Sequence, residues 1–170
     1  MNVSDAIRTN RAVRKFADRP LDEDAVRAIL NAGRRAQSSR NTQPRQFIAI
    51  RDPEKLRWLS TMGPYSGHLA GAALGVVILT PDPADDLSVL LDAGQSIALM
   101  MLAAWELGIG SAITTLQEVE QVQKELGVPA EYQVRYALSF GYPADPEMLQ
   151  QPPKGGGRKP LEEVVHWEQW

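Results

Sequence analysis

The spacing of apolar residues along the chain predicts helices and strands over most of its length. Helical spacing indicates five helices, over residues 4–8, 20–36, 52–62, 87–107 and 118–127. Ser4 and Asp22 are the expected N-caps of the first two, since short oxygen-bearing side chains can accept hydrogen bonds from free N–H groups. Gly127 is the expected end of the last one.

Four further segments are extended and apolar, over residues 46–51, 74–80, 108–116 and 134–143. Residues 74–80, LGVVILT, are apolar on both faces and are expected at the centre of a sheet. The order of elements favours an α+β fold, with a small mixed or antiparallel sheet of about four or five strands flanked by helices. It does not give the regular βαβ alternation of a dinucleotide-binding fold.

The middle of the long helix, IALMMLAAW at 97–105, is apolar on every side. A helix of this kind is surrounded by protein. In a chain of 170 residues a second copy of the subunit is one way to surround it, so we expect a homodimer. The uncharged run in this helix, 93–105, is shorter than the roughly 20 residues that cross a bilayer, and no membrane segment is expected. MNVSDAIRTN lacks the apolar region of a signal peptide, which predicts a cytoplasmic protein.

Composition and charge narrow the possible chemistry. The chain has no cysteine, and its two histidines, His68 and His166, lie far apart, so neither a thiol nucleophile nor a metal site is expected. Residues 1–45 hold ten Lys/Arg and five Asp/Glu, a balance of +5 in a chain whose net charge is −3. A basic region on an acidic protein favours a local anion site over a nucleic-acid surface.

Four stretches in fixed order carry a resemblance to a known family. They are NRAVRKF at 10–16, AQSSRNTQPRQF at 36–47, LDAGQSIALMMLAAWELGIGSAI at 91–113 and GGRKPLEEVVHWEQW at 156–170. Together they resemble the motifs of the nitroreductase family of FMN-dependent flavoproteins, and the chain looks like a short member. Ala12 stands where the family motif has a serine, and Arg45 stands where it has a tryptophan.

The resemblance implies that Arg11, Ala12 and Arg14 lie against the phosphate and ribityl chain of FMN, joined by Arg158 from the far end of the chain. Guanidinium groups suit a phosphate because they offer charge and paired donors in a fixed geometry. The alternative is that the first two arginines are solvated surface and that Arg158 is part of a linker.

The resemblance also assigns flavin contacts to the second and third motifs. Ser38, Ser39 and Asn41 would reach the FMN held mainly by the other subunit, which places the sites at the interface of the homodimer. Alternatively these three residues only form the loop after a helix. The turn after the long helix would lie at the reactive edge of the ring, where a backbone amide bonds N5. Its candidates, which could equally be core strand, are Gly110, Ser111, Ile113 and Thr114.

A single domain is expected over 1–170, with 152–170 as a linker and a carboxy-terminal tail. The tail has apolar side chains at Leu161, Val164 and Trp167, which predicts that it docks on its own domain or on the partner subunit.

The implied activity is that of an FMN-dependent oxidoreductase. FMN would take a hydride from NAD(P)H at N5 and pass electrons to a nitroaromatic, a quinone or a related acceptor in ping-pong turnover, without a catalytic side chain. Three alternatives remain open. One is a flavin-dependent oxidase or dehalogenase of the same fold, the second is a flavin-binding dimer without turnover, and the third is a basic nucleic-acid module.

Overall fold

The computed structural model describes residues 2–149 and 157–170. The five helices of this part are α1 (Val3–Thr9), α2 (Glu23–Arg34), α3 (Pro53–Leu59), α4 (Ser88–Glu106) and α5 (Val119–Leu126). The strands are β1 (Gln46–Ile50), β2 (Leu74–Thr80), β3 (Gly110–Thr115) and β4 (Gln133–Gly141). Short 3₁₀ helices are η1 (Ser39–Asn41), η2 (Ser66–Gly71), η3 (Pro146–Leu149) and η4 (Leu161–Glu163).

The four described strands form one antiparallel sheet in the order β1-β2-β4-β3. Every residue of β2 is buried, which confirms that LGVVILT is a central strand. The α+β class is confirmed as well, and between the described strands the sheet is antiparallel instead of mixed.

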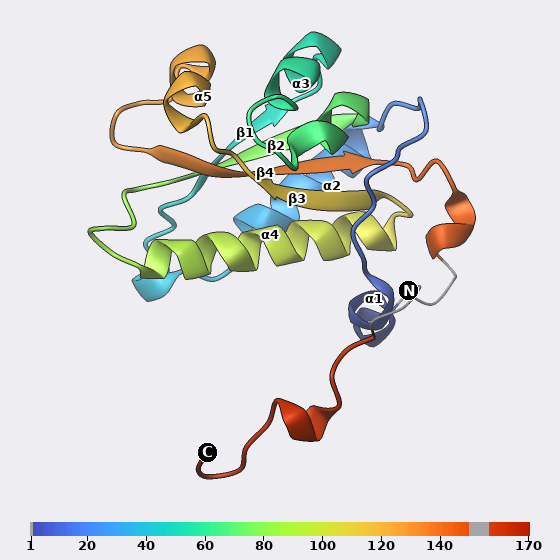
Figure 1. Cartoon of the computed structure of the whole chain (residues 1–170), viewed down its shortest axis with the longest axis vertical. Coiled ribbons are helices and arrows are strands. Elements are labelled where there is room, and N and C mark those ends of the chain that lie inside the picture. Colours follow the sequence, from blue (N-terminus) through green and yellow to red (C-terminus); the bar gives the residue numbers. More distant parts are fainter. Residues whose placement is uncertain (1, 150–156) are drawn as a thin grey trace.

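Helices cover both faces of the sheet (Figure 1). Helices α2 and α4 pack on one face, where Val76, Met100 and Phe140 belong to a buried apolar cluster. Helix α3, helix α5 and η2 cover the other face, where Leu56 and Val122 belong to a second cluster. The sheet is therefore the middle layer of a three-layer domain. Neighbouring residues of a strand point to opposite faces of the sheet and so contact different helices.

Helix ends follow the expected caps, with one correction. The Asp22 carboxylate accepts a hydrogen bond from the Ala25 N–H at 2.8 Å, and Gly127 ends α5 with a left-handed φ of 63°. Helix α1, however, is capped by Asn2 and not by Ser4, because the Asn2 Oδ1 accepts from the Asp5 N–H at 2.8 Å. Asparagine and serine cap equally well, so the sequence alone did not separate these two starts.

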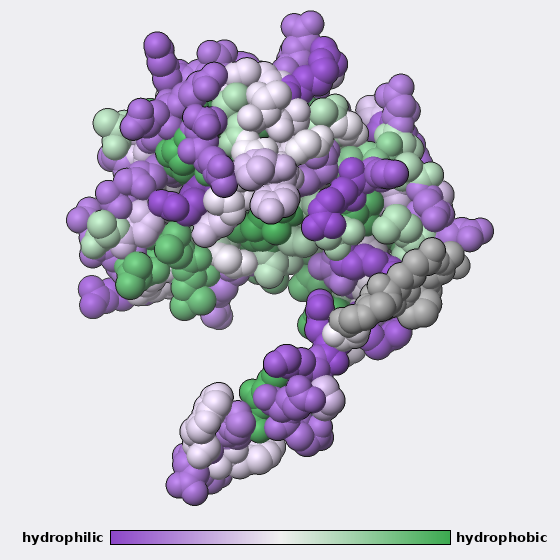
Figure 2. All heavy atoms as spheres, in the orientation of Figure 1, coloured by the Kyte–Doolittle hydropathy of each residue, from purple (hydrophilic) through white to green (hydrophobic). Residues whose placement is uncertain are grey.

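Helix α4 is long and apolar enough to cross a membrane by length and composition, the one such helix in the described residues. In the fold it is a core helix on one side, with Ile97, Met100 and Trp105 buried against the domain. Its other side is not covered by the described residues: Leu91 is 68% exposed, and apolar surface gathers over α4 in Figure 2.

The carboxy-terminal residues 157–170 lie outside the three layers (Figure 1). Their backbone hydrogen bonds are local, as from the Val165 N–H to the Leu161 carbonyl at 2.9 Å. Trp170 is 99% exposed and Trp167 is exposed as well. Docking of this tail on its own domain, one of the two expected arrangements, is therefore not what the structure shows. Most of the predicted linker lies outside the described residues.

Candidate functional site

The arginine segment, residues 10–16, crosses the end of the sheet beside β3. Ala12 forms a parallel bridge with Ser111, and the Val13 N–H donates to the Ser111 carbonyl at 2.8 Å. A second bridge joins Phe16 to Pro143 just past the end of β4. The first and third sequence motifs, almost a hundred residues apart, therefore meet in one place.

Two glycines make this close crossing possible. A Cβ atom built on Gly110 would lie 2.6 Å from the Cβ of Val13, and one built on Gly141 would lie 2.9 Å from the ring of Phe16. Any larger residue would push the segment off the strands. Gly110, predicted as a flavin contact, thus has a definite packing role: it seats the arginine segment.

Arg11 and Arg14 leave the seated segment in different surroundings. Arg11 is half-buried, and its guanidinium carbon lies 5.9 Å from the ring centre of Trp105, within the range of a cation–π contact. Arg14 is exposed, and no hydrogen bond or ion pair to the rest of the described chain engages its side chain. Its donors are therefore available to an anion.

The four candidates on β3 point in alternate directions. Ser111 and Ile113 lie opposite Phe140 and Leu138 of β4, on the face of α4. Gly110 and Thr114 share the opposite face, where the Thr114 and Ser66 hydroxyl oxygens are 3.2 Å apart and buried. Ile113, at 42% exposure, has the most accessible side chain of the four.

The outer edge of β3 is open beyond its start. Its pairing with the arginine segment ends at the Ala12–Ser111 bridge, and in the described residues no other strand lies on that side. Backbone donors and acceptors of the remaining strand are therefore available to a ligand or to a second chain.

His68 is buried on η2, on the same face as the seated arginine segment. Its Nδ1 lies 2.7 Å from the Ser139 hydroxyl, while Nε2 is buried and has no partner in the described structure. Burial lowers the pKa of His68, and the nearby charge of Arg14 lowers it further. A neutral ring fits this site because protonation would place an unbonded N–H in the interior.

The pH dependence of stability follows from His68. With a folded pKa below the usual 6.5, the unfolded chain binds this proton more readily, so stability is lost as the pH falls below about 6.5. The slope from one such group is at most about 1.4 kcal/mol per pH unit. We expect urea unfolding to show a smaller loss between pH 7.5 and 5.5 in His68→Asn than in the wild type or in His166→Asn. An equal loss in all three would contradict this assignment.

The second motif forms an exposed loop at the end of α2. The Gln43 N–H donates to the Ser38 hydroxyl at 2.9 Å, and the Ser39 N–H donates to the Asp92 carboxylate on α4. Ser39 and Asn41 are exposed, and Asn41 has a left-handed φ of 56°. Their polar groups therefore face outward from a loop that is fixed from within.

The structure does not bring the two halves of the predicted site together in one chain. The loop of residues 37–43, called the serine loop below, is hydrogen-bonded to Asp92 near the start of α4. The arginine segment lies beside Trp105 near the end of that helix (Figure 1). Thirteen residues of helix separate these two positions, which is about 20 Å. Arg158 lies exposed at the start of the tail, and no hydrogen bond or ion pair holds its side chain in the described structure.

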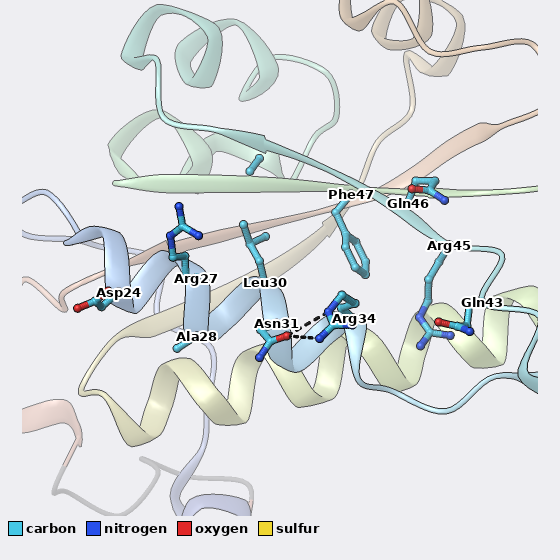
Figure 3. Close-up of a pocket in the computed structure, with 11 residues that line it drawn as sticks. Asp24, Arg27, Ala28, Leu30, Asn31, Arg34, Gln43, Arg45, Gln46 and Phe47 are labelled. Carbon is cyan, nitrogen blue, oxygen red and sulfur yellow. Dashed lines mark hydrogen bonds between the residues drawn. The ribbon is translucent and has the colours of Figure 1, made fainter.

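A groove between α2 and β1 was not expected from the sequence. It has a volume of about 860 Å³ and an apolar floor that includes Leu30 and Phe47 (Figure 3). Arg27, Arg34 and Arg45 are among the basic residues along it, and Arg34 donates to the Asn31 side-chain oxygen. The basic positions of α2 were visible in the sequence, but their position beside an edge strand was not.

The fold and motifs match known proteins over most of the chain. The nitroreductase family matches residues 7–66 and 60–142. A protein of Archaeoglobus fulgidus with the provisional name NADH dehydrogenase/NAD(P)H nitroreductase is 32% identical, over 82% of this chain and 84% of that one. An NADPH-flavin oxidoreductase of Vibrio harveyi is 26% identical, over 99% of this chain and 75% of that one.

Solved structures of this family have the same fold. An FMN-dependent nitroreductase from Clostridium difficile R20291 superposes with a TM-score of 0.83 at 25% identity, covering 99% of this chain and 100% of that one. The fold and the matches define an NAD(P)H-dependent flavin oxidoreductase by class, which confirms the predicted kind of enzyme. The chain belongs to the nitroreductase family.

Proposed function

We propose that this chain binds FMN at the interface of a homodimer and uses NAD(P)H to reduce a nitroaromatic, a quinone or a related acceptor. The observation that carries the proposal is the arginine segment seated on Gly110 beside the open edge of β3. It puts cationic side chains and unpaired backbone groups of one edge strand at the same place.

The residues present fit a flavin phosphate. Arg14 offers an exposed guanidinium. Arg11, on the same segment, lies over the ring of Trp105. Two planar guanidinium groups on one short, fixed segment can share a doubly charged group through charge-assisted hydrogen bonds. Ala12 contributes no hydroxyl, so these two side chains and nearby backbone N–H groups would carry the contact.

The protein itself would bind FMN and orient its ring. When bound, FMN supplies the redox chemistry by taking a hydride from NAD(P)H and passing electrons to the acceptor. The exposed side of β3 at Ile113 would support the ring, and the strand's outer backbone would direct its edge. Because donor and acceptor would use the same open space in turn, the expected kinetics are ping-pong.

Helix α4 supports the homodimer. Its uncovered positions follow one another at intervals of three or four residues, which places them on one side of the helix. Leu91, Gly94, Ala98 and Leu99 are exposed, and Gln95 and Leu102 beside them are half-buried. An exposed apolar stripe with small residues at its centre fits a close contact with a second helix of the same kind.

A two-fold dimer would also complete the site. Two α4 helices packed in opposite directions bring the end of one beside the start of the other, so the arginine segment of one subunit approaches Ser39 and Asn41 of its partner. The tail, which is not docked on its own domain, would cross to the partner subunit and carry Arg158 to the phosphate.

The visible spectrum of the purified protein tests this proposal. We expect flavin absorption that is bleached by NADH or NADPH without oxygen and returns when a nitroaromatic or quinone is added. A yellow protein that neither donor bleaches would favour a flavin-binding dimer without this turnover. A colourless protein that takes up no added FMN would refute the proposal.

A further inference from the structure

The loop of residues 37–43 has a strained backbone. Arg40, Asn41 and Gln43 have φ values of 51°, 56° and 50°, in the left-handed region that residues other than glycine rarely occupy. Such a conformation persists only where surrounding groups hold it. Since its side chains are largely exposed, the groups that hold this loop must contact its backbone.

Two buried charged residues outside the loop supply those contacts. The Asp92 carboxylate, on α4, accepts from the Ser39 N–H with both oxygens, at 3.3 and 3.2 Å. From the other end, the Arg45 guanidinium donates to the carbonyls of Ala36 and Gln37, the latter at 3.0 Å. Asp92 is 2% exposed and Arg45 is 6% exposed, so water competes little for either contact.

Burying two charged side chains is costly unless they are hydrogen-bonded and compensated by opposite charge. Burial lowers the pKa of Arg45, and the negative charge of Asp92 offsets part of that effect. No direct ion pair joins the two side chains in the described structure. Each one instead holds a different part of the loop backbone, while their opposite charges reduce the cost of burial.

We propose that Asp92 and Arg45 are positioning residues that hold the 37–43 loop in a preorganised shape for its contact with the flavin of the partner subunit. This inference rests on the proposed function, because it assumes that Ser38, Ser39 and Asn41 make that contact. Arg45 stands where the family motif has a tryptophan, so this chain fixes the loop by hydrogen bonds to carbonyls.

Trypsin cleavage after Arg40 measures the order of the loop independently of flavin and activity. The full chain would be compared as wild type, Asp92→Ala, Arg45→Met and Ser96→Ala, with cleavage identified by fragment mass. Ser96→Ala is the matched control because Ser96 is also buried on α4 but bonds only the Asp92 backbone carbonyl. Asp92→Asn keeps one oxygen for the Ser39 N–H. FMN affinity of each variant would be measured by fluorescence quenching.

We expect Asp92→Ala and Arg45→Met to raise the cleavage rate about ten-fold or more and to weaken FMN binding in parallel. Asp92→Asn should recover most of both losses, and Ser96→Ala should match the wild type. If Asp92→Ala fails to fold, Arg45→Met still decides the question.

Unchanged cleavage in folded Asp92→Ala and Arg45→Met would overturn the positioning role, whatever happens to FMN binding. Faster cleavage with unchanged FMN affinity would overturn the link between this loop and the flavin, while the rest of the proposed function stands. A wild-type protein that binds no FMN would instead refute the proposed function itself, and this inference with it.

Discussion

Replacing Arg14 by glutamine is expected to weaken FMN binding by roughly 10- to 100-fold. A charge-assisted hydrogen bond contributes about 1.5–3 kcal/mol, and Arg14 is exposed with no hydrogen bond or ion pair of its side chain in the described structure. Its loss therefore removes a ligand contact without breaking a contact of the fold. The measurement is the dissociation constant of FMN by fluorescence quenching, with far-UV circular dichroism to verify folding.

Arg8→Gln is the matched control for this prediction. Arg8 is also exposed and belongs to the same basic region, but its side chain pairs with Asp5 at 3.1 Å on α1. If Arg8→Gln weakens FMN binding as much as Arg14→Gln does, the effect comes from general positive charge and not from a phosphate contact. An unchanged dissociation constant in Arg14→Gln would contradict the assignment of this arginine to the site.

The elements of the fold were predictable because each depends on local pattern. LGVVILT has no polar face, so it had to be central, and Gly127 could end α5 because it adopts a left-handed φ without strain. The cap of α1 was missed by two residues because Asn2 and Ser4 are equally good caps.

The candidate site was only partly predictable. Its arginines were visible as a basic cluster. The need for glycine at position 110 was not visible, since it depends on close packing against Val13 of a distant segment. The surroundings of His68 likewise depend on distant segments, through its contact with Ser139 and the nearby charge of Arg14. Contacts between segments that are far apart in sequence leave no local periodicity to read.

Asp92 shows where a usable signal was present. It is the one charged residue between Ser88 and Trp105, in a helix that is otherwise mostly apolar or small. A lone carboxylate in such a helix needs a partner if it is buried. The structure gives that partner as the backbone of the serine loop, which the sequence had assigned to flavin binding for separate reasons.

A charge placed on the uncovered stripe of α4 is expected to dissociate the proposed dimer and release FMN. Ala98 is exposed at the middle of that stripe, and glutamate is a good helix former, so Ala98→Glu should leave the fold of each subunit intact. In a closely packed two-fold contact, the substitution would bring two carboxylates together in an apolar surface. Light scattering coupled to size-exclusion chromatography would report the mass, and flavin absorption would report the cofactor.

Gln121→Glu on α5 is the control, since it places the same new charge on an exposed position of a helix that covers the opposite face of the sheet. It should remain dimeric and yellow. The distance between the arginine segment and the serine loop makes the two losses in Ala98→Glu inseparable: about 20 Å of α4 keeps these halves of the site apart in one chain. A monomer that still binds FMN with wild-type affinity would show that one subunit holds the complete site, and a dimer that survives the substitution would place the interface on another surface.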